Sequence, residues 1–270
     1  MGAMNYRHAF HAGNFADVVK HLALVSILSY LKKKDAGFAV IDTHAGRGAY
    51  DLGGDEARRG GEAAGGIERL RDVAGGPETL QTYLALAHGR AYPGSPLIAA
   101  KLLRTQDRLT AIEKHPEDYR ALAATLAPFR RARVVEADGY ARLAALLPPP
   151  ERRGLVLIDP PYEAPDEFAQ AARAAGAALA RFATGIVAIW FPIKSPAAAA
   201  AFCGEVLAAG ARKALRLDIR IDAKPERLSA AGLLVINPPY GVAADMGEVL
   251  EFVAPRLGGT AKLAWLAGAE

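Results

Sequence analysis

Two stretches of almost the same sequence follow apolar runs in this chain: residues 158–162 read IDPPY and residues 236–240 read INPPY. Two successive prolines stiffen a turn, because each proline fixes its φ angle. In the first copy, the Asp159 carboxylate and the Pro160 carbonyl become hydrogen-bond acceptors in fixed positions. Tyr162 adds an aromatic face on which a planar base could stack. The first copy therefore has the groups to hold a planar amine at the end of a strand.

A glycine-bearing turn follows the predicted strand at residues 37–42, which read GFAVID. Gly46 and Gly48 accept unusual dihedral angles and let the backbone approach a ligand closely. The pattern alone is weak support for nucleotide binding, because the third glycine of G-x-G-x-x-G is missing. Asp42 at the strand end and Gly46 in the turn are the candidates for contact with a bound ligand.

Two further acids come at the ends of predicted strands. Glu113 ends the second strand, where a carboxylate can accept both hydroxyls of a ribose, although an exposed strand-end acid is equally compatible. Asp138 and Gly139 follow the third strand, where Asp138 could accept a hydrogen bond from an adenine amino group or cap a helix. No cluster of His, Cys and acidic residues has the spacing of metal ligands, so we expect no metal site.

Continuous apolar strands alternate with helices along most of the chain. This alternation predicts an α/β fold with a mostly parallel sheet that is covered on both faces. The last two strands have a short connection, which predicts an antiparallel hairpin at the end of a seven-stranded sheet. The predicted strands cover residues 37–42, 109–113, 132–137, 154–159, 185–191, 213–221 and 231–237, and the predicted helices cover residues 15–34, 116–127, 139–147, 165–181 and 196–209.

An insertion separates the first strand from its crossover helix. Residues 51–66 are rich in Gly and charge and predict a loop, and short helices are expected near 66–73 and 77–88. The crossover helix starts only at Ser95 and Pro96, with Ser95 expected as the N-cap. We therefore expect one domain over residues 1–270, a motif helix within residues 4–34 and a small inserted helical subdomain at about 50–92.

The composition is that of an ordinary soluble globular protein, with 51% hydrophobic and 23% charged residues. No apolar run is long enough for a membrane span, and the N-terminus lacks the apolar core of a secretion signal. The lone Cys203 cannot form an internal disulfide and fits a reducing compartment. These features predict a cytoplasmic protein. The net charge of +4 permits a polyanionic partner without requiring one.

Taken in order, the pattern is acid-x-x-x-G-x-G, a strand-end acid, Asp-Gly and Asp-Pro-Pro-Tyr. This order resembles the S-adenosylmethionine-dependent amino-methyltransferases, in which D/N-P-P-Y/F/W serves methylation of adenine N6 and similar nitrogens. The N6 lone pair is delocalised into the ring, so acceptors for both N–H bonds would direct it at the methyl group. The resemblance implies a Rossmann-like class I methyltransferase fold and S-adenosylmethionine as cofactor. The catalytic residues that it implies are Asp159, Pro160, Pro161 and Tyr162.

Longer motifs resemble one family over nearly the whole chain, among them YRHAFHAGNFADVVKH, DTHAGRGAY, YPGSPLIA, ADGY and GLLVINPPY. They are similar to the RlmJ family of bacterial 23S ribosomal RNA adenine-N6 methyltransferases. The resemblance implies a monomer that acts on naked or partly assembled 23S RNA, with the insertion as a candidate RNA-contacting surface. Tyr6 would touch the RNA substrate or gate the site. Together with the turn residues, the cofactor-binding set is Lys20, His21, Asp42, His44, Gly46, Ser95, Glu113, Asp138, Gly139 and Asp159.

Three other functions are compatible with parts of the pattern. A DNA adenine-N6 methyltransferase would share the pocket, but such enzymes usually carry more mass for reading duplex bases than this small insertion. A nicotinamide-dependent dehydrogenase is disfavoured by the missing third glycine. A non-enzymatic RNA-binding protein would not need the intact set of acids and the intact DPPY.

Strand direction separates the two Pro-Pro-Tyr copies. In the fold that the sequence resembles, the strand that ends at Asp159 lies beside the first strand and opens onto the cofactor. The strand that ends at Asn237 is the antiparallel last one, so its carboxyl end points away from that pocket. We therefore expect one active site at Asp159 and a structural strand exit at Asn237.

Overall fold

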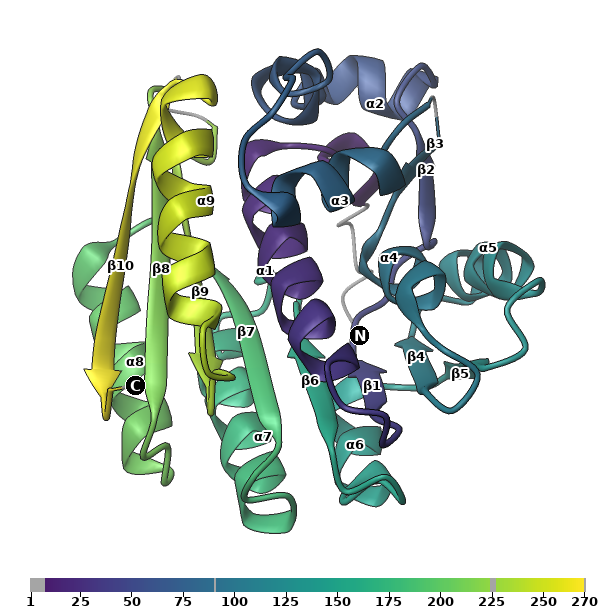
Figure 1. Ribbon diagram of the computed structural model, residues 1–270, viewed down its shortest axis with the longest axis vertical. Coiled ribbons are helices and arrows are strands. Elements are labelled where there is room, and N and C mark those ends of the chain that lie inside the picture. The colour runs from purple at the N-terminus through teal and green to yellow at the C-terminus, as the bar shows by residue number, and fades with distance from the viewer. Residues whose placement is uncertain (1–7, 90, 224–226, 270) are drawn as a thin grey trace.

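A mixed sheet of eight strands forms the centre of the computed structural model, which describes residues 8–89, 91–223 and 227–269 (Figure 1). The strand order across this described sheet is β10-β8-β9-β7-β6-β1-β4-β5. The strands are β1 (Ala39–Asp42), β4 (Arg108–Glu113), β5 (Ala132–Glu136), β6 (Gly154–Ile158), β7 (Ile186–Pro192), β8 (Ala214–Ile221), β9 (Ala230–Ile236) and β10 (Gly259–Ala267).

Parallel pairing joins five neighbouring strands, β5, β4, β1, β6 and β7. Every residue of β1 and of β6 is buried, because helices cover both faces of the sheet there. Burial on both faces is the reason that these strands read as continuous apolar runs. The predicted α/β fold with a mostly parallel, Rossmann-like sheet is confirmed.

The other end of the sheet is antiparallel and contains one strand more than the seven expected. β9 lies between β7 and β8 and pairs antiparallel with both, as the short connection predicts for β8 and β9. The hairpin is not the end of the sheet, however, because β10 pairs antiparallel with the outer side of β8. As an edge strand, β10 is partly exposed along its length, so it lacks the continuous apolar run that marks the inner strands.

Helices form a layer on each face of the sheet (Figure 1). The long helix α1 is buried over most of its length, because helices α3, α4 and α9 pack around it. An apolar surface on nearly all sides is typical of a helix in that position. One layer contains α1 (Phe15–Lys32), α3 (Glu78–Leu86), α4 (Ser95–Leu102), α5 (Pro116–Leu126) and α9 (Val242–Arg256), and the other contains α6 (Gly139–Leu143), α7 (Glu167–Arg181) and α8 (Pro196–Ala208).

The segment between β1 and α4 is closed by a two-stranded ribbon of β2 (Ala49–Asp51) and β3 (Ala91–Pro93). The loop expected at 51–66 was wrong in part, since it contains α2 (Asp55–Gly60). Acids in the first turn and arginines in the last turn of α2 suit the helix dipole, and Gly61 ends it with a φ of 63°. The helix expected near 66–73 is a single 3-10 turn, η3 (Ile67–Arg69), after η2 (Ala63–Gly65).

Among the helices in the described ranges, none has the length and apolar character needed to cross a membrane.

Candidate active site

A cavity of about 820 Å³ opens where β1, β4, β5 and β6 end. In an open α/β sheet, ligands bind beyond the carboxyl ends of the strands. Most of the residues predicted from the sequence meet at its wall: Lys20, His21, His44, Gly46, Ser95, Glu113, Asp138, Gly139, Asp159, Pro160 and Pro161. Asp42 and Tyr162 are not among the lining residues, and Tyr6 lies outside the residues that the structure describes.

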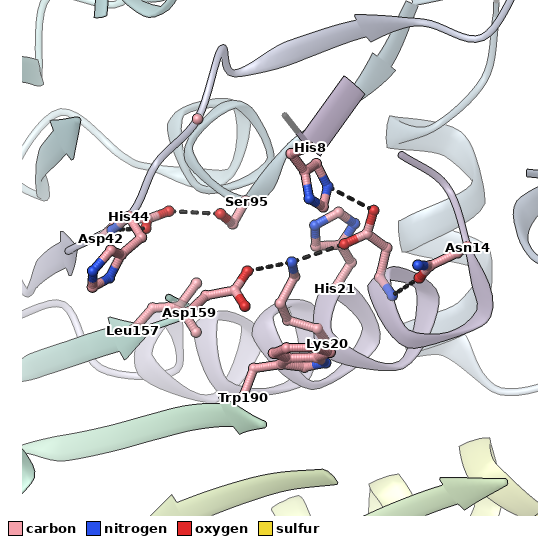
Figure 2. Close-up of polar contacts among 12 residues, drawn as sticks. His8, Asn14, Lys20, His21, Asp42, His44, Ser95, Leu157, Asp159 and Trp190 are labelled. Carbon is pink, nitrogen blue, oxygen red and sulfur yellow. Dashed lines mark hydrogen bonds and ion pairs between the residues drawn. The ribbon is translucent and has the colours of Figure 1, made fainter. Parts of the chain in front are cut away.

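Lys20 and Asp159 form an ion pair at the wall of the cavity, as Figure 2 shows. The Lys20 ammonium donates to Asp159 Oδ2 over 2.5 Å and to Asp17 Oδ1 over 2.8 Å. Burial disfavours the ammonium, but the charges of Asp159 and Asp17 outweigh it and hold the pKa of Lys20 well above its usual value. Lys20 is therefore a permanent cation that fixes the position of the Asp159 carboxylate.

Asp17 joins the start of α1 to this ion pair. Its Oδ2 accepts hydrogen bonds from the Gly13 backbone N–H over 3.0 Å and from His8 Nε2 over 2.9 Å. Asn14 is the N-cap of α1 and accepts from the Asp17 backbone N–H over 2.8 Å. Burial raises the pKa of Asp17, yet His8 and Lys20 outweigh burial and hold that pKa well below its usual range. Asp17 thus links the start of α1 to Lys20, which lines the cavity.

Asp42 ends β1 beneath the cavity and is 1% exposed. Burial raises the pKa of Asp42 to about 6, opposed by a hydrogen bond that Ser95 Oγ donates over 2.6 Å. Ser95 was expected to be the N-cap of the crossover helix, which was wrong: Gly94 is the N-cap, and the Ser95 hydroxyl is bonded to Asp42 instead. Ser95 therefore links α4 to the end of β1.

His44 follows in the turn, and burial lowers its pKa to about 4, so the ring is neutral at pH 7. Its Nδ1 lies 2.8 Å from Thr43 Oγ1. The His44 ring packs edge-on against Tyr140, with 4.8 Å between ring centroids. These contacts orient a neutral imidazole at the cavity wall.

The turn at Gly46 is bonded to the end of β4. The Gly46 backbone N–H donates to Glu113 Oε2 over 2.8 Å, and the His115 N–H donates to Glu113 Oε1 over 2.7 Å. Gly46 has a φ of 60°, and a Cβ at this position would meet the Tyr50 hydroxyl at 2.2 Å. The glycine is therefore required by backbone conformation and by space. Burial raises the pKa of Glu113, whose carboxylate remains at the cavity wall.

Asp138 caps α6, because its side chain accepts from the Ala141 N–H over 3.1 Å. It also accepts from Lys114 Nζ over 2.9 Å and still lines the cavity. A Cβ on Gly139 would lie 2.0 Å from the Thr43 carbonyl oxygen, so only glycine lets α6 approach the turn after β1. Of the two roles that the sequence left open, Asp138 therefore has that of a helix cap, and it also lies at the cavity wall.

The profile of the family described as ribosomal RNA large subunit methyltransferase D, RlmJ, matches residues 35–267. The chain belongs to this family. It is 40% identical to ribosomal RNA large subunit methyltransferase J of Escherichia coli K12 over 97% of this chain and 99% of that protein. It is 41% identical to the protein of the same name from Haemophilus influenzae over 94% of each chain. A crystal structure from Legionella pneumophila superposes with a TM-score of 0.87 at 33% identity, covering 96% of this chain and 99% of that one.

Tyr162, the last residue of DPPY, is turned toward the sheet layer rather than the cavity. Its hydroxyl donates to the Trp190 carbonyl over 2.7 Å, and its ring packs on Phe168 and Trp190 at centroid distances of 4.8 and 5.8 Å. Its φ of 52° completes the sharp exit from β6. Here Tyr162 supports the loop that carries Asp159, and stacking of a base on its ring stays a prediction.

The second copy lies at the opposite end of the strands from the cavity, as predicted. β9 runs antiparallel to β7, so Ile236 pairs with Val187 near the start of β7. Asn237 follows with a φ of 51°, and its Nδ2 donates to the carbonyls of Ala183 and Gly185, each over 2.9 Å. Asn237 therefore closes a loop and is remote from the cavity.

Other residues at or behind the cavity wall were missed by reading the sequence. Asp17 stands three positions before Lys20 in a predicted helix, and that spacing was the available signal for their ion pair. His8 also lines the cavity. Tyr140 donates to Glu167 over 2.9 Å, a contact between distant segments for which the sequence has no local signal. In the described part of this family member, no three His, Cys, Asp or Glu side chains are grouped to hold a metal ion.

Proposed function

We propose that this protein methylates the exocyclic N6 of an adenine in 23S ribosomal RNA and uses S-adenosylmethionine as methyl donor. The observation that carries the proposal is Asp159 at the end of β6, at the wall of the cavity and held by Lys20. Membership of the RlmJ family supports the same function. The names of the E. coli and H. influenzae relatives give the class of substrate, large-subunit ribosomal RNA.

The residues at the cavity fit this cofactor. Glu113, at the end of β4, has an acceptor for ribose hydroxyls, and Asp138 has one for an adenine amino group. His21 is 1% exposed, and its Nε2 has no hydrogen-bond partner among the described residues, so it can bond a ligand. Lys20, His44, Gly46, Ser95 and Gly139 complete the proposed binding wall, with Asp42 behind it.

S-adenosylmethionine supplies an electrophilic methyl group on a sulfonium, which becomes a thioether when the methyl moves to N6 and one N6 proton is released. The protein's part is to hold the amine. Lys20 occupies Asp159 Oδ2, while Oδ1 has no donor among the described residues and can accept an N6 hydrogen. Pro160 and Pro161 fix the turn, so the Pro160 carbonyl is a second acceptor. A carboxylate beside a nitrogen that becomes positive also stabilises the transition state.

The RNA is proposed to approach the open side of the cavity, past the inserted segment of about residues 50–92. We treat that segment as a small helical subdomain of one domain over residues 1–270 and as an RNA-contacting surface. Arg58 and Arg59 at the end of α2 are exposed cations on it. Tyr6 is proposed to contact the RNA or gate the site. We propose that a monomer acts on naked or partly assembled RNA, because single-stranded bases are accessible there.

The test is a methylation assay with purified protein and S-adenosylmethionine labelled on its methyl group. The substrates are 23S RNA transcribed in vitro, assembled large subunits and duplex DNA. We expect label in the transcript as N6-methyladenosine after digestion to nucleosides, and little in the other two. Label in DNA alone would overturn the RNA assignment, and label in assembled subunits alone would overturn the proposed assembly stage.

A folded protein that binds the transcript and transfers no label would support the non-enzymatic alternative. Asp159→Asn is the matched control, because it keeps the shape of the side chain and removes its charge. It should bind the transcript as the unchanged protein does, and it should transfer little label.

A further inference from the structure

Three buried side chains form a hydrogen-bonded chain behind the cavity wall. His21 Nδ1 lies 2.9 Å from the Tyr92 hydroxyl, which lies 2.8 Å from the Tyr83 hydroxyl. Both tyrosines are 0% exposed and His21 is 1% exposed. His21 comes from α1, Tyr92 from β3 and Tyr83 from α3, so the inserted segment supplies two of the three groups. The other ring nitrogen of His21, Nε2, has no partner within the described chain, and His21 lines the cavity.

The protons of this chain can be assigned from the available acceptors. Burial raises the pKa of Tyr83 and of Tyr92, so both hydroxyls keep their hydrogens. Burial lowers the pKa of His21 to about 3, so its ring carries one proton at pH 7. Three protons therefore serve two hydrogen bonds, and one N–H or O–H must point elsewhere.

Two directions of donation run along the whole chain; in a third arrangement His21 Nδ1–H and Tyr83 both donate to Tyr92, whose own hydrogen then has no acceptor among the described residues. If Tyr83 donates to Tyr92 and Tyr92 donates to His21 Nδ1, the spare hydrogen is on Nε2, the unpartnered nitrogen of a ring that lines the cavity. If His21 Nδ1–H donates to Tyr92 and Tyr92 to Tyr83, the spare hydrogen is on Tyr83, whose hydroxyl has no other partner in the described ranges. A buried hydroxyl hydrogen without an acceptor is costly, whereas a hydrogen on Nε2 can reach a ligand. The first direction is therefore favoured.

We propose that Tyr92, supported by Tyr83, is a positioning residue that fixes His21 as the neutral Nε2–H tautomer and so presents a hydrogen-bond donor to the carboxylate of S-adenosylmethionine. This inference rests on the proposed cofactor. The carboxylate is the one anionic group of that molecule, and an uncharged donor can bind it without adding a second cation beside Lys20. The inserted segment thereby orients a residue of the cofactor site, because its Tyr92 is bonded to His21 of α1.

The first test needs no substitution. Nitrogen-15 chemical shifts of the His21 ring in the ligand-free protein distinguish a protonated Nε2 from a protonated Nδ1. The proposal expects the proton on Nε2 at pH 7. A proton on Nδ1 would overturn it, whatever the activity assay shows.

The second test compares Tyr92→Phe with Tyr83→Phe. Tyr92→Phe removes the partner of Nδ1, so both tautomers should become populated. Tyr83→Phe should keep the Nε2–H tautomer, because Tyr92 can still donate to Nδ1. Thr79→Val is the control: it removes a buried hydroxyl of α3 that donates to Asp245, and His21 should not respond. A tautomer left unchanged in folded Tyr92→Phe would overturn the role of Tyr92.

The ligand is tested by calorimetry with S-adenosylmethionine and with its decarboxylated form. Tyr92→Phe should weaken binding of S-adenosylmethionine by about 2- to 5-fold, because only the fraction of the protein that keeps the Nε2–H tautomer presents the donor. Binding of the decarboxylated form should change by less than about twofold. Equal weakening for both ligands would overturn the carboxylate assignment. Failure of the unchanged protein to bind either ligand would instead reject the proposed cofactor, while the tautomer result would still stand.

Discussion

The two Pro-Pro-Tyr strand exits share four of five residues but have different surroundings. The exit of β6 at Asp159 opens onto the cavity and is bonded to a buried cation, Lys20. The exit of β9 at Asn237 is at the other end of the strands, near the start of β7, where the side chain donates to two backbone carbonyls. Strand direction produces this difference, because β6 is parallel to β1 and β9 is antiparallel to β7.

In both copies, the Pro-Pro-Tyr motif forms a turn directly after a strand. Both exits have a left-handed residue, Tyr162 with φ of 52° in one and Asn237 with φ of 51° in the other. The left-handed residue is the last of DPPY in the first exit and the Asn of NPPY in the second, so the prolines stiffen two turns of different shape. Chemistry requires more than the turn: in this chain, a cation that holds the side chain at the strand end and a cavity in front of it.

The largest effect is expected from exchanging the two polar residues. Asp159→Asn should lower the rate of methyl transfer by about 10²- to 10³-fold, the usual loss when one positioned electrostatic group is removed. Asn237→Asp added to this variant should not restore activity, because the new carboxylate would be at the end of the strands that faces away from the cavity. Single-turnover transfer to the 23S transcript measures both. Recovery of transfer in the double variant would show that the second exit can serve as an active site.

The next effect concerns the cation that distinguishes the two exits. Lys20→Met leaves Asp17 and Asp159 without their shared partner, and breaking such a buried pair costs about 3–5 kcal/mol of the free energy of unfolding. Urea unfolding at pH 7 measures this loss. Asn237 has no such cation, and its replacement should not reproduce the pH dependence described next.

The pH dependence of this loss follows from Asp17, whose pKa is held below its usual range. A carboxyl with a lowered folded pKa stabilises the protein above its unfolded pKa of about 3.9 and loses that contribution as the pH falls. Lys20 causes part of the lowering, so Lys20→Met should be less sensitive to acid. The unfolding free energies of the two proteins should converge as the pH falls from about 5 toward the lowered pKa of folded Asp17. Parallel curves would contradict this account of Lys20.

A smaller effect, on stability alone, is expected at the second exit. Asn237→Ala removes two hydrogen bonds and places alanine in the left-handed region, at a cost of about 2–3 kcal/mol in the free energy of unfolding. Methyl transfer by the folded variant should stay within about twofold, because the residue is remote from the cavity. Asn237→Gly is the control, since it relieves the backbone strain and still lacks the hydrogen bonds. A loss of activity as large as that of Asp159→Asn, with the protein folded, would refute the distinction.

The sequence predicted the strands that lead to the site because helices bury both of their faces. It did not predict α9 and β10, which lie beyond the second exit. The apolar residues of α9 at Val242, Met246, Val249 and Val253 have helical spacing, so that signal was present. β10 is a half-exposed edge strand, and its pattern is weak.

Within the site, the sequence predicted acids and glycines at strand ends, because these follow directly from strand direction. It could not predict their partners. Lys20 and Asp159 are 139 positions apart, and His21 and Tyr92 are 71 apart. No local periodicity joins such pairs, and only the packing of α1 against the sheet and the inserted segment brings them together. The predicted stacking role of Tyr162 rested on residue type alone, which does not determine the direction of a side chain.

The smallest expected effect compares the two tyrosines that end the copies. Tyr162 donates its hydroxyl to the Trp190 carbonyl, so Tyr162→Phe should lower the free energy of unfolding by about 1 kcal/mol. Tyr240 is 74% exposed, and Tyr240→Phe should change it by less than about 0.5 kcal/mol. Urea unfolding of both variants under one condition checks the difference. Equal losses would mean that Tyr240 has a structural contact like that of Tyr162, and the two tyrosines would then not distinguish the exits.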